Sequence, residues 1–282
     1  MRDSVQVGIA YCDRIADLLS RPTTVDYVEI PYELLKTTPG VIESVSGTRV
    51  VLHCASLSVA GTIPPHAALC EDVSFWARRT ETPWIGEHLA FIVADSDANA
   101  MADEYAPGEP YNIGYTVSPA YDSGTIARIQ QSLQVCRRSI ESTILLENVP
   151  VYVPTPASNM SPAQFMSEVC RVTDVGLLLD LTHWLITCDT LGLDPFAEMR
   201  SLPWHRIVET HVSGVERESH VLFDNHASTA PTVVIDLLSE ACKRADNLAA
   251  VTLEYNWSST VPVDTLVHEI ERVRQAVVGA MR

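Results

Sequence analysis

The chain has 282 residues, of which 46% are hydrophobic and 20% are charged, and these values are typical of one globular domain with a large core. Its 36 acidic residues against 19 basic ones give a formal net charge of -17. Such a charge repels phosphate backbones and anionic lipid surfaces, so we expect no nucleic-acid partner and no membrane partner.

The seven cysteines show no CxxC pair and no spacing of a secreted disulfide framework. The N-terminal segment lacks a signal-peptide pattern, and no apolar stretch of roughly eighteen residues follows it. The sequence therefore predicts a soluble, cytoplasmic protein with reduced thiols.

Eight runs rich in Val, Ile and Leu have the pattern of buried strands. They cover residues 5–11, 25–31, 49–54, 84–91, 142–149, 175–181, 206–213 and 248–255. Helix-compatible segments lie between them, at 14–20, 67–79, 123–139, 162–171, 194–200, 231–245 and 262–278. The unit after the second strand is weak, because Pro39-Gly40 breaks its helical pattern. Alternating strands and helices predict a parallel sheet, and eight such units predict a single (β/α)8 TIM-barrel domain, residues 1–282.

The longest irregular stretch, residues 93–119, follows the fourth strand and is rich in acidic residues. We expect it at the face where the strands end. A loop of this length is either a lid or docking surface, or a solvated insertion without a role.

Residues that can bind a metal stand at the ends of short segments that each look like the tip of a buried strand. The segments are VDYVEI, VVLHC, WIGEHLAF, ILLENV, LLLDLTH, IVETHVSG, VLFDNH and VTLEYN. A lone histidine at a strand end is more often a hydrogen-bonded structural residue than a ligand. Carboxylates, however, are seldom buried unless they are paired or bind a metal. The repeated pattern therefore indicates a metal site at the C-terminal face of the barrel.

The candidate ligands fall into three sets. Four residues end consecutive strands and form a hard, mostly oxygen set for iron, manganese or another divalent ion. They are Glu147, Asp180, His211 and Glu254. The second set, His53, His88 and Glu147, resembles the two histidines and one carboxylate of non-haem iron oxygenases, and Glu147 would bridge the two sets.

A third ion would be held by residues next to the first set, some of them from the loop after the seventh strand. These are Asn148, His183, Asp224 and His226. The residues assigned catalytic roles are Glu147, His53, His88 and Asp180. Further residues either support the ligands from behind or are purely structural, depending on where strand alternation points them. They are Glu29, Glu87, Glu209 and Asn256.

In combination and order, the motifs of this chain resemble those of the multinuclear non-haem iron-dependent oxidative enzymes. The motifs are YVEI at 27–30, LHCASLSVAG at 52–61, GEHLAF at 86–91, LLEN at 145–148, GLLLD at 176–180, HVSG at 211–214 and DNH at 224–226. The resemblance runs nearly end to end. It implies a barrel like that of xylose isomerase, two or three iron ions of mixed Fe(II)/Fe(III) state, dioxygen as co-substrate, and the ten ligands of the three sets.

The resemblance also implies oxidative modification of a residue, first cysteine and otherwise aspartate or asparagine, in a ribosomally synthesised precursor peptide. A separate partner protein would bind the leader of that peptide, since no leader-binding domain is expected in this chain. Two positions depart from the common family pattern. His183 stands where asparagine is frequent, which favours a third metal, and Asn256 stands where an acid is frequent, which puts an acid/base role there in doubt.

Two other classes of function are open. A non-redox divalent-metal enzyme of the same barrel type would be a sugar isomerase or a trinuclear phosphodiesterase. The net charge argues against DNA as a substrate, and the absence of a lysine close to the candidate ligands argues against an isomerase. A non-catalytic metal-binding or scaffold protein would give no reason for several adjacent ions.

Overall fold

Eight parallel strands close into a barrel in the computed structural model, which describes residues 4–21, 25–95, 110–255 and 261–281. The strands are β1 Gln6–Ala10, β2 Tyr27–Pro31, β3 Arg49–Cys54, β4 Trp84–His88, β7 Thr143–Glu147, β8 Gly176–Asp180, β9 Ile207–Ser213 and β12 Ala250–Glu254. Each strand pairs with the next barrel strand along the chain, and β12 closes the sheet against β1. The predicted TIM barrel is confirmed, because each of the eight strands pairs on both sides and the sheet closes on itself.

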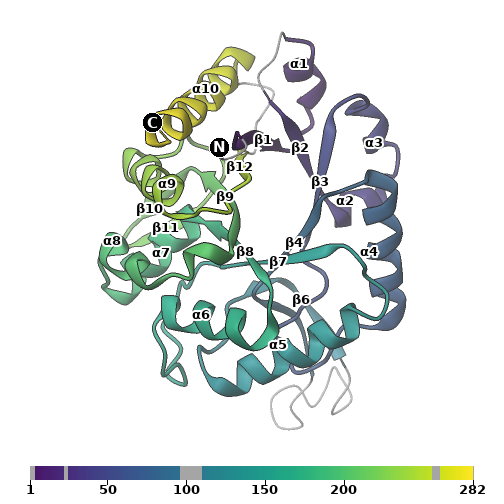
Figure 1. The fold of residues 1–282 in the computed structure, drawn as a ribbon, viewed down its shortest axis with the longest axis vertical. Helices are drawn as coiled ribbons and strands as arrows, with labels where there is room; N and C mark the ends of the chain where they lie inside the picture. Colours follow the sequence, from purple (N-terminus) through teal and green to yellow (C-terminus); the bar gives the residue numbers. More distant parts are fainter. Residues whose placement is uncertain (1–3, 22–24, 96–109, 256–260, 282) are drawn as a thin grey trace.

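Helices surround the strands (Figure 1). They are α1 Ile15–Leu19, α2 Tyr32–Thr37, α3 Val41–Ser44, α4 Ala67–Thr80, α5 Ser123–Cys136, α6 Pro162–Thr173, α7 Leu181–Leu191, α8 Pro195–Glu198, α9 Thr232–Arg244 and α10 Val263–Ala280. Side-chain hydrogen bonds fix the first residues of α5 and α6. Asp122 accepts a hydrogen bond from the backbone of Thr125, and Ser161 and Gln164 form a reciprocal capping box. The apolar faces of these helices pack on the outside of the sheet and form the main core with it.

The sequence predicts no helix at the position of α7, because the LLLDLTH segment has the pattern of a strand end. Its signals are nevertheless in the sequence. Asp180 accepts a hydrogen bond from the backbone of His183 at the start, and Gly192 ends the helix with a φ of 66°. His183 therefore projects from the first turn of a helix and not from a strand.

Two hairpins interrupt the regular alternation of strand and helix. The first joins β5 Phe91–Asp95 and β6 Pro110–Val117, and the second joins β10 Val215–Glu218 and β11 Val221–Asp224. The predicted strand 84–91 is therefore wrong beyond His88, where the barrel strand ends. The interpretation of VLFDNH as the tip of a buried strand is also wrong, because β11 pairs only with β10 outside the barrel. Most of the stretch predicted to be irregular, residues 96–109, lies outside the described residues.

The barrel interior is layered. At its N-terminal end Tyr27, Val51 and Ala250 form a separate apolar cluster, with Trp84 packed against it. Since side chains alternate along a strand, the residues two positions after these point inward at the next level. This places polar side chains, Glu29 and His53 among them, directly above an apolar floor.

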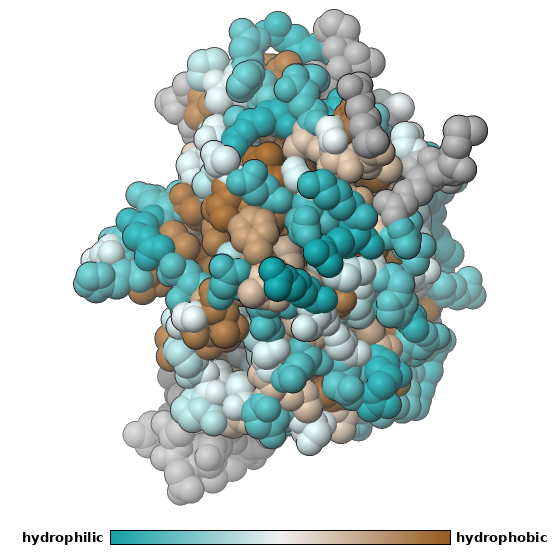
Figure 2. Space-filling view, turned by 60° about the vertical axis from the view of Figure 1, so that its left-hand side comes forward, coloured by the Kyte–Doolittle hydropathy of each residue, from teal (hydrophilic) through white to brown (hydrophobic). Residues whose placement is uncertain are grey.

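All seven cysteines are free and buried. Among the helices of the described ranges, none is long and apolar enough to cross a bilayer. Apolar side chains are exposed among hydrophilic ones on the side that carries α8 and the β10–β11 hairpin (Figure 2). Phe196 of α8 is 37% exposed and Phe223 of β11 is 39% exposed.

Candidate metal centre

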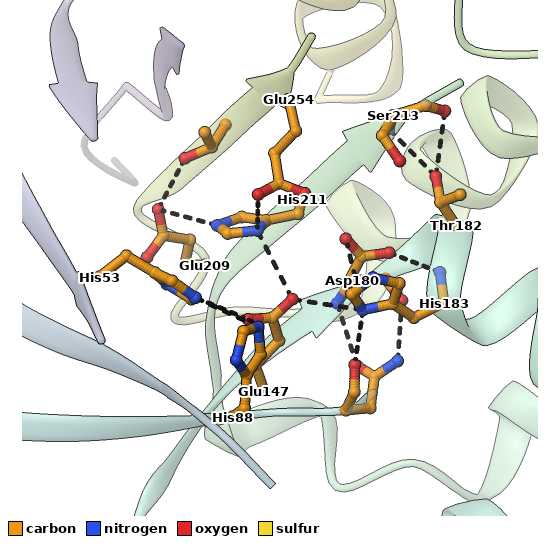
Figure 3. Close-up of polar contacts among 12 residues, drawn as sticks. His53, His88, Glu147, Asp180, Thr182, His183, Glu209, His211, Ser213 and Glu254 are labelled. Carbon is orange, nitrogen blue, oxygen red and sulfur yellow. Dashed lines mark hydrogen bonds and ion pairs between the residues drawn. The ribbon is translucent and has the colours of Figure 1, made fainter. Parts of the chain in front are cut away.

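Polar side chains gather at the C-terminal ends of the barrel strands. The sheet register places His88 of β4 beside Glu147 of β7, and Asp180 of β8 beside His211 of β9. Parallel strands all end at one face of a barrel, so residues far apart in sequence become neighbours there. Figure 3 shows Glu147 in the middle of the resulting cluster.

Glu147 is only 1% exposed and uses its two oxygens differently. Its Oε2 atom lies 3.2 Å from Nε2 of His53 and 3.2 Å from Nε2 of His88. Its Oε1 atom lies 3.3 Å from Nδ1 of His183 and 3.7 Å from Nδ1 of His211. Each oxygen of this carboxylate faces its own pair of imidazoles. That geometry suits a residue placed between two neighbouring ions.

The first predicted set comes together beside Glu147. Asp180, His211 and Glu254 each offer one ligand atom, and these atoms lie within 4.8 Å of one another. Nδ1 of His211 is 3.5 Å from Oε1 of Glu254, and Asp180 and His211 are fully buried. With Glu147, this gives three carboxylates and one imidazole around one small volume, a mostly oxygen donor set.

The second predicted set, His53, His88 and Glu147, also comes together within 4.8 Å. The Nε2 atoms of the two histidines are 3.4 Å apart, and their rings meet edge to face. Gly86 of β4 makes room for this arrangement. A Cβ atom at position 86 would lie 2.5 Å from Nδ1 of His53, so the ring can occupy its place only beside a glycine.

The third set is built from outside the barrel strands. Oδ2 of Asp224, the last residue of β11, lies 3.0 Å from Nε2 of His183 and 2.6 Å from Nε2 of His226. His226 follows in the left-handed region with a φ of 48°, and its Nε2 is also 3.4 Å from Oε2 of Glu254. The hairpin thus brings an acid and an imidazole against the barrel-built cluster.

Asn148, the remaining predicted ligand, directs its amide to the backbone of β8. Its Nδ2 donates to the carbonyl of Asp180 at 2.9 Å, and its Oδ1 accepts from the Asp180 amide at 3.0 Å. Its own backbone carbonyl lies 2.9 Å from Nδ1 of His183. In this structure Asn148 ties the ends of β7 and β8 together, whereas the other nine predicted ligands face one another.

The carboxylates of the cluster favour protons on the imidazoles, and burial opposes them. Burial lowers the pKa of His53, but the Glu147 carboxylate outweighs burial and raises this pKa to about 10. In His88 burial prevails, and the pKa falls to about 4. Burial raises the pKa of Asp180 to about 7, whereas in Glu254 the nearby imidazoles outweigh burial and lower the pKa to about 2. A divalent cation would take the place of these protons, which is the usual exchange when a metal binds.

Several buried atoms of the cluster have no hydrogen-bond partner among the described residues. They are His53 Nδ1, His88 Nδ1, Glu147 Oε2, Asp180 Oδ2, His211 Nδ1 and Glu254 Oε2. An unsatisfied buried polar atom costs about 1–3 kcal/mol, so native proteins keep few of them. Four of these atoms face other members of the cluster, and their lone pairs are satisfied if cations bind there: Glu147 Oε2, Asp180 Oδ2, His211 Nδ1 and Glu254 Oε2. Both the donor types and their lack of other partners therefore fit a centre of divalent metal ions.

Two of the residues expected to support the ligands lie inside the barrel behind the cluster. Oε2 of Glu29 is 3.1 Å from Nε2 of His211. Glu209 lies deeper and accepts a hydrogen bond of 2.6 Å from Nε1 of Trp84. Burial and the neighbouring Glu29 raise the pKa of Glu209 to about 7.

The other two expected residues do not join this arrangement. Oε2 of Glu87 accepts a hydrogen bond from the backbone of Leu57, so its side chain points to the loop after β3 and away from the cluster. Burial raises its pKa well above the usual range. Asn256 lies outside the described residues.

Some residues that contact the cluster were not singled out from the sequence. Oγ of Ser213 donates to Oδ1 of Asp224 at 2.8 Å and so attaches the hairpin to the barrel. The aromatic rings of Tyr152 and Phe223 stack beside Asp224, with centroids 5.5 Å apart. Strand alternation could have found Ser213, because it lies two residues after His211 and must share its inward face. The pairing of Tyr152 with Phe223 carries no sequence signal, since it depends on the hairpin.

The fold and the donor cluster define a barrel of the xylose isomerase type with a candidate metal centre at the C-terminal face. Solved structures of this type match nearly the whole chain. The 3-keto-D-glucoside 4-epimerase YcjR of E. coli is 15% identical, with a TM-score of 0.58 over 96% of this chain and 100% of its own. A xylose isomerase described as putative from Rhodospirillum rubrum is 14% identical, with a TM-score of 0.55 over 98% of this chain and 99% of its own. At these identities the likeness concerns the fold.

The sequence itself decides the family. The model of the RiPP precursor modification enzymes MbnB/TglH/ChrH matches residues 6–278, and the chain belongs to this family. The predicted resemblance is thereby confirmed. Among relatives, the UPF0276 protein Anae109_1558 of Anaeromyxobacter sp. strain Fw109-5 is 30% identical and matches 94% of this chain and 90% of its own. A UPF0276 protein of Caulobacter vibrioides is 25% identical over 92% of this chain and 89% of its own.

Proposed function

We propose that this protein is an iron- and oxygen-dependent enzyme that oxidatively modifies a residue in a ribosomally synthesised precursor peptide. Cysteine is the expected target, with aspartate and asparagine as alternatives. The observation that carries the proposal is Glu147, a buried carboxylate between two groups of imidazoles in a chain that belongs to a family of peptide-modifying enzymes. A non-redox enzyme with one metal would have no need of such a shared carboxylate.

The donor sets suggest how the ions would be arranged. His53 and His88 would hold one ion together with Oε2 of Glu147, and Asp180, His211 and Glu254 would hold another next to Oε1. The set of two histidines and one carboxylate leaves coordination positions open for substrate and oxygen. His183, Asp224 and His226 would hold a third ion, and Asn148 would join them if its amide left the backbone of Asp180.

When bound, the iron ions would supply a ligand position for a substrate thiolate and the electrons for reduction of dioxygen. The chain's own residues would do the positioning. The shared carboxylate of Glu147 would keep two ions next to each other. A thiolate on one ion would then lie close to the open positions of the other, which is catalysis by proximity. The buried cluster and the apolar barrel floor would keep bulk water from the reacting atoms.

The peptide would reach the centre across the rim formed by the β10–β11 hairpin and the loop after β7. Tyr152 and Phe223 stack on this rim and remain 38% and 39% exposed. Flat apolar rings with free faces beside a candidate site suit the packing of peptide side chains. A separate partner protein would deliver the peptide by its leader.

The sugar-isomerase alternative lacks a supporting observation at the cluster. Such an enzyme is expected to place a lysine beside the metal ligands. Both lysines of the chain, Lys36 on α2 and Lys243 on α9, are exposed on helices instead.

The test is co-expression with a short precursor peptide encoded beside the protein, together with its delivery partner, followed by mass spectrometry of the peptide. We expect a mass change that requires oxygen, that a Cys→Ser peptide does not show, and that His53→Ala and Asp180→Ala abolish. Glu43→Ala, on the exposed surface of α3, is the matched control and should behave like the wild type. No iron after anaerobic purification, or an unmodified peptide in the presence of oxygen, would refute the proposal.

A further inference from the structure

Glu29 occupies a position that the candidate ligand sets do not use. It stands on β2 and is 2% exposed, and Oε2 lies 3.1 Å from Nε2 of His211. The other ring nitrogen of His211, Nδ1, faces Oε1 of Glu254 at 3.5 Å and Oε1 of Glu147 at 3.7 Å. The imidazole therefore lies between Glu29 on one side and the candidate ligands on the other.

This position determines which nitrogen of His211 is free to bind a cation. A neutral imidazole has one N–H donor and one nitrogen lone pair. The nitrogen that faces Glu29 must carry the hydrogen, because a carboxylate only accepts. The lone pair is then on Nδ1, which points at the cluster and has no hydrogen-bond partner among the residues of the described ranges.

A network of polar side chains holds Glu29 in place from below. Oγ1 of Thr252 is 3.4 Å from Oε2 of Glu29, 2.9 Å from Oε1 of Glu209 and 2.7 Å from the hydroxyl of Tyr27. Glu209 is fixed in turn by Nε1 of Trp84 at 2.6 Å. These residues are on four different barrel strands, so the orientation of Glu29 is set by the rigid part of the fold.

A second histidine lies within reach of the same carboxylate. Oε1 of Glu29 is 3.9 Å from Nδ1 of His53, whose Nε2 faces Glu147. The two oxygens of Glu29 thus lie behind one histidine of the first set and one of the second. A cation bound by Glu29 itself would take the lone pairs of His53 Nδ1 and His211 Nε2. The opposite nitrogens of both rings would then carry hydrogens and could not bind a cation beside Glu147.

We propose that Glu29 is a positioning residue of the metal centre, which orients His211, and more weakly His53, so that their inner nitrogens bind divalent cations. The inference rests on the proposed metal centre and adds to it a residue that does not touch the ions. Carboxylates behind metal-binding histidines fix the tautomer and raise the basicity of the ring, and their loss weakens metal affinity by about 10–100-fold.

The experiment is titration of the metal-free full-length protein with Co²⁺ under anaerobic conditions, followed by visible absorption and by competition with a chelator. Glu29→Ala should weaken the binding of one ion by about 10–100-fold. At saturating Co²⁺, the variant should bind as many ions as the wild type, with an altered absorption spectrum. Glu29→Gln keeps an acceptor oxygen but not the charge, so its affinity should fall less. Thr252→Val removes the hydroxyl below Glu29 together with its contacts to Glu209 and Tyr27, and it should show the smallest change in the same direction.

The outcomes separate the possible roles. Wild-type affinity and spectrum in Glu29→Ala would overturn the proposal, and so would the loss of a whole ion at saturation, because Glu29 would then be a ligand. If Glu29→Ala does not fold, the Glu29→Gln variant decides, and an unchanged affinity and spectrum there would overturn the proposal. Wild-type protein that binds fewer than two Co²⁺ ions would instead refute the multinuclear centre itself. Glu43→Ala is again the control, since Glu43 is exposed on α3.

Discussion

Glu147, Asp180 and His211 stand on strands inside the barrel, whereas Asp224 and His226 stand on the β10–β11 hairpin and in the loop after it. The barrel residues are completely or almost completely buried, and the sheet register fixes their neighbours. The hairpin pair is only partly buried. Its position depends on local contacts and not on a ladder of strands.

Side-chain contacts and not strand pairing attach the hairpin to the barrel, and of the residues in β10 and β11 only Leu222 is buried. Ser213 donates to Asp224, and Gly214 allows the returning chain to approach, since a Cβ there would lie 2.1 Å from the carbonyl oxygen of Ser228. Local structure with few buried contacts opens at lower free energy than a core strand. The comparison therefore predicts a centre with a rigid inner part and a more easily lost outer part.

The largest effect is expected at Glu147, which both inner donor sets share. Glu147→Ala removes the carboxylate between them, so we expect the rate of peptide modification to fall by more than about 100-fold. Residues that only support metal ligands cost about 10–100-fold when they are lost. Iron bound per chain should fall below two, by elemental analysis of anaerobically purified protein. If the variant retained two ions and measurable activity, the inner part would not depend on a shared carboxylate.

Asp224→Ala should separate the outer part from the inner part. The variant loses the acid that faces His183 and His226. We therefore expect it to lose one ion, or to bind that ion with about 10–100-fold lower affinity. The ions held by the barrel strands should stay. Stoichiometric metal titration with elemental analysis measures both. Loss of every ion in this variant would show that the two parts do not differ as the structure indicates.

Gly86→Ala tests the inner part without removing a ligand. The added methyl group would lie 2.5 Å from Nδ1 of His53, so the ring must move or the strand must shift. Such overpacking costs about 1–3 kcal/mol, and we expect a lower free energy of unfolding and weaker metal binding by His53. Gly279→Ala on α10 is the matched control, because a methyl group there meets open space and a helical glycine is replaced by a better helix former. Equal effects of both substitutions in urea unfolding and metal titration would contradict the role of Gly86.

The smallest effect is expected at the rim. The hydroxyl of Tyr152 is 3.4 Å from the backbone nitrogen of Asp224, a long hydrogen bond, whereas the ring stacks on Phe223. Tyr152→Phe should change kcat/KM by only about twofold, the effect of about 0.5 kcal/mol. Tyr152→Ala removes the stack and should raise KM for the peptide more than it lowers kcat. An unchanged KM in the alanine variant would exclude the rim as the path of the peptide.

The same division explains what could be predicted from sequence. The inner part follows from periodicity, because the apolar runs that carry its residues became barrel strands with these residues at or near their C-terminal ends. Glu147, Asp180, His211 and Glu254 were placed on consecutive strands for this reason, and the strand order agrees. The rule needs only alternation and the parallel sheet.

The outer part could not be placed in this way. The segment that ends in Asp224 has the composition of a buried strand. In the structure, however, it pairs with β10 and forms one strand of a hairpin, and its composition does not indicate this. The apolar run before His183 predicts a strand end there, although Asp180 is a good helix N-cap and Gly192 a good helix end. The amide of Asn148 bonds to backbone groups of Asp180 that no sequence pattern identifies.

The most direct test of the central claim is the iron content and magnetic coupling of the anaerobically purified protein, measured by elemental analysis with Mössbauer spectroscopy. A centre built around a shared Glu147 predicts two or three iron ions per chain, at least two of them magnetically coupled, and loss of the coupling in Glu147→Ala. One iron ion per chain, or several without coupling, would contradict it.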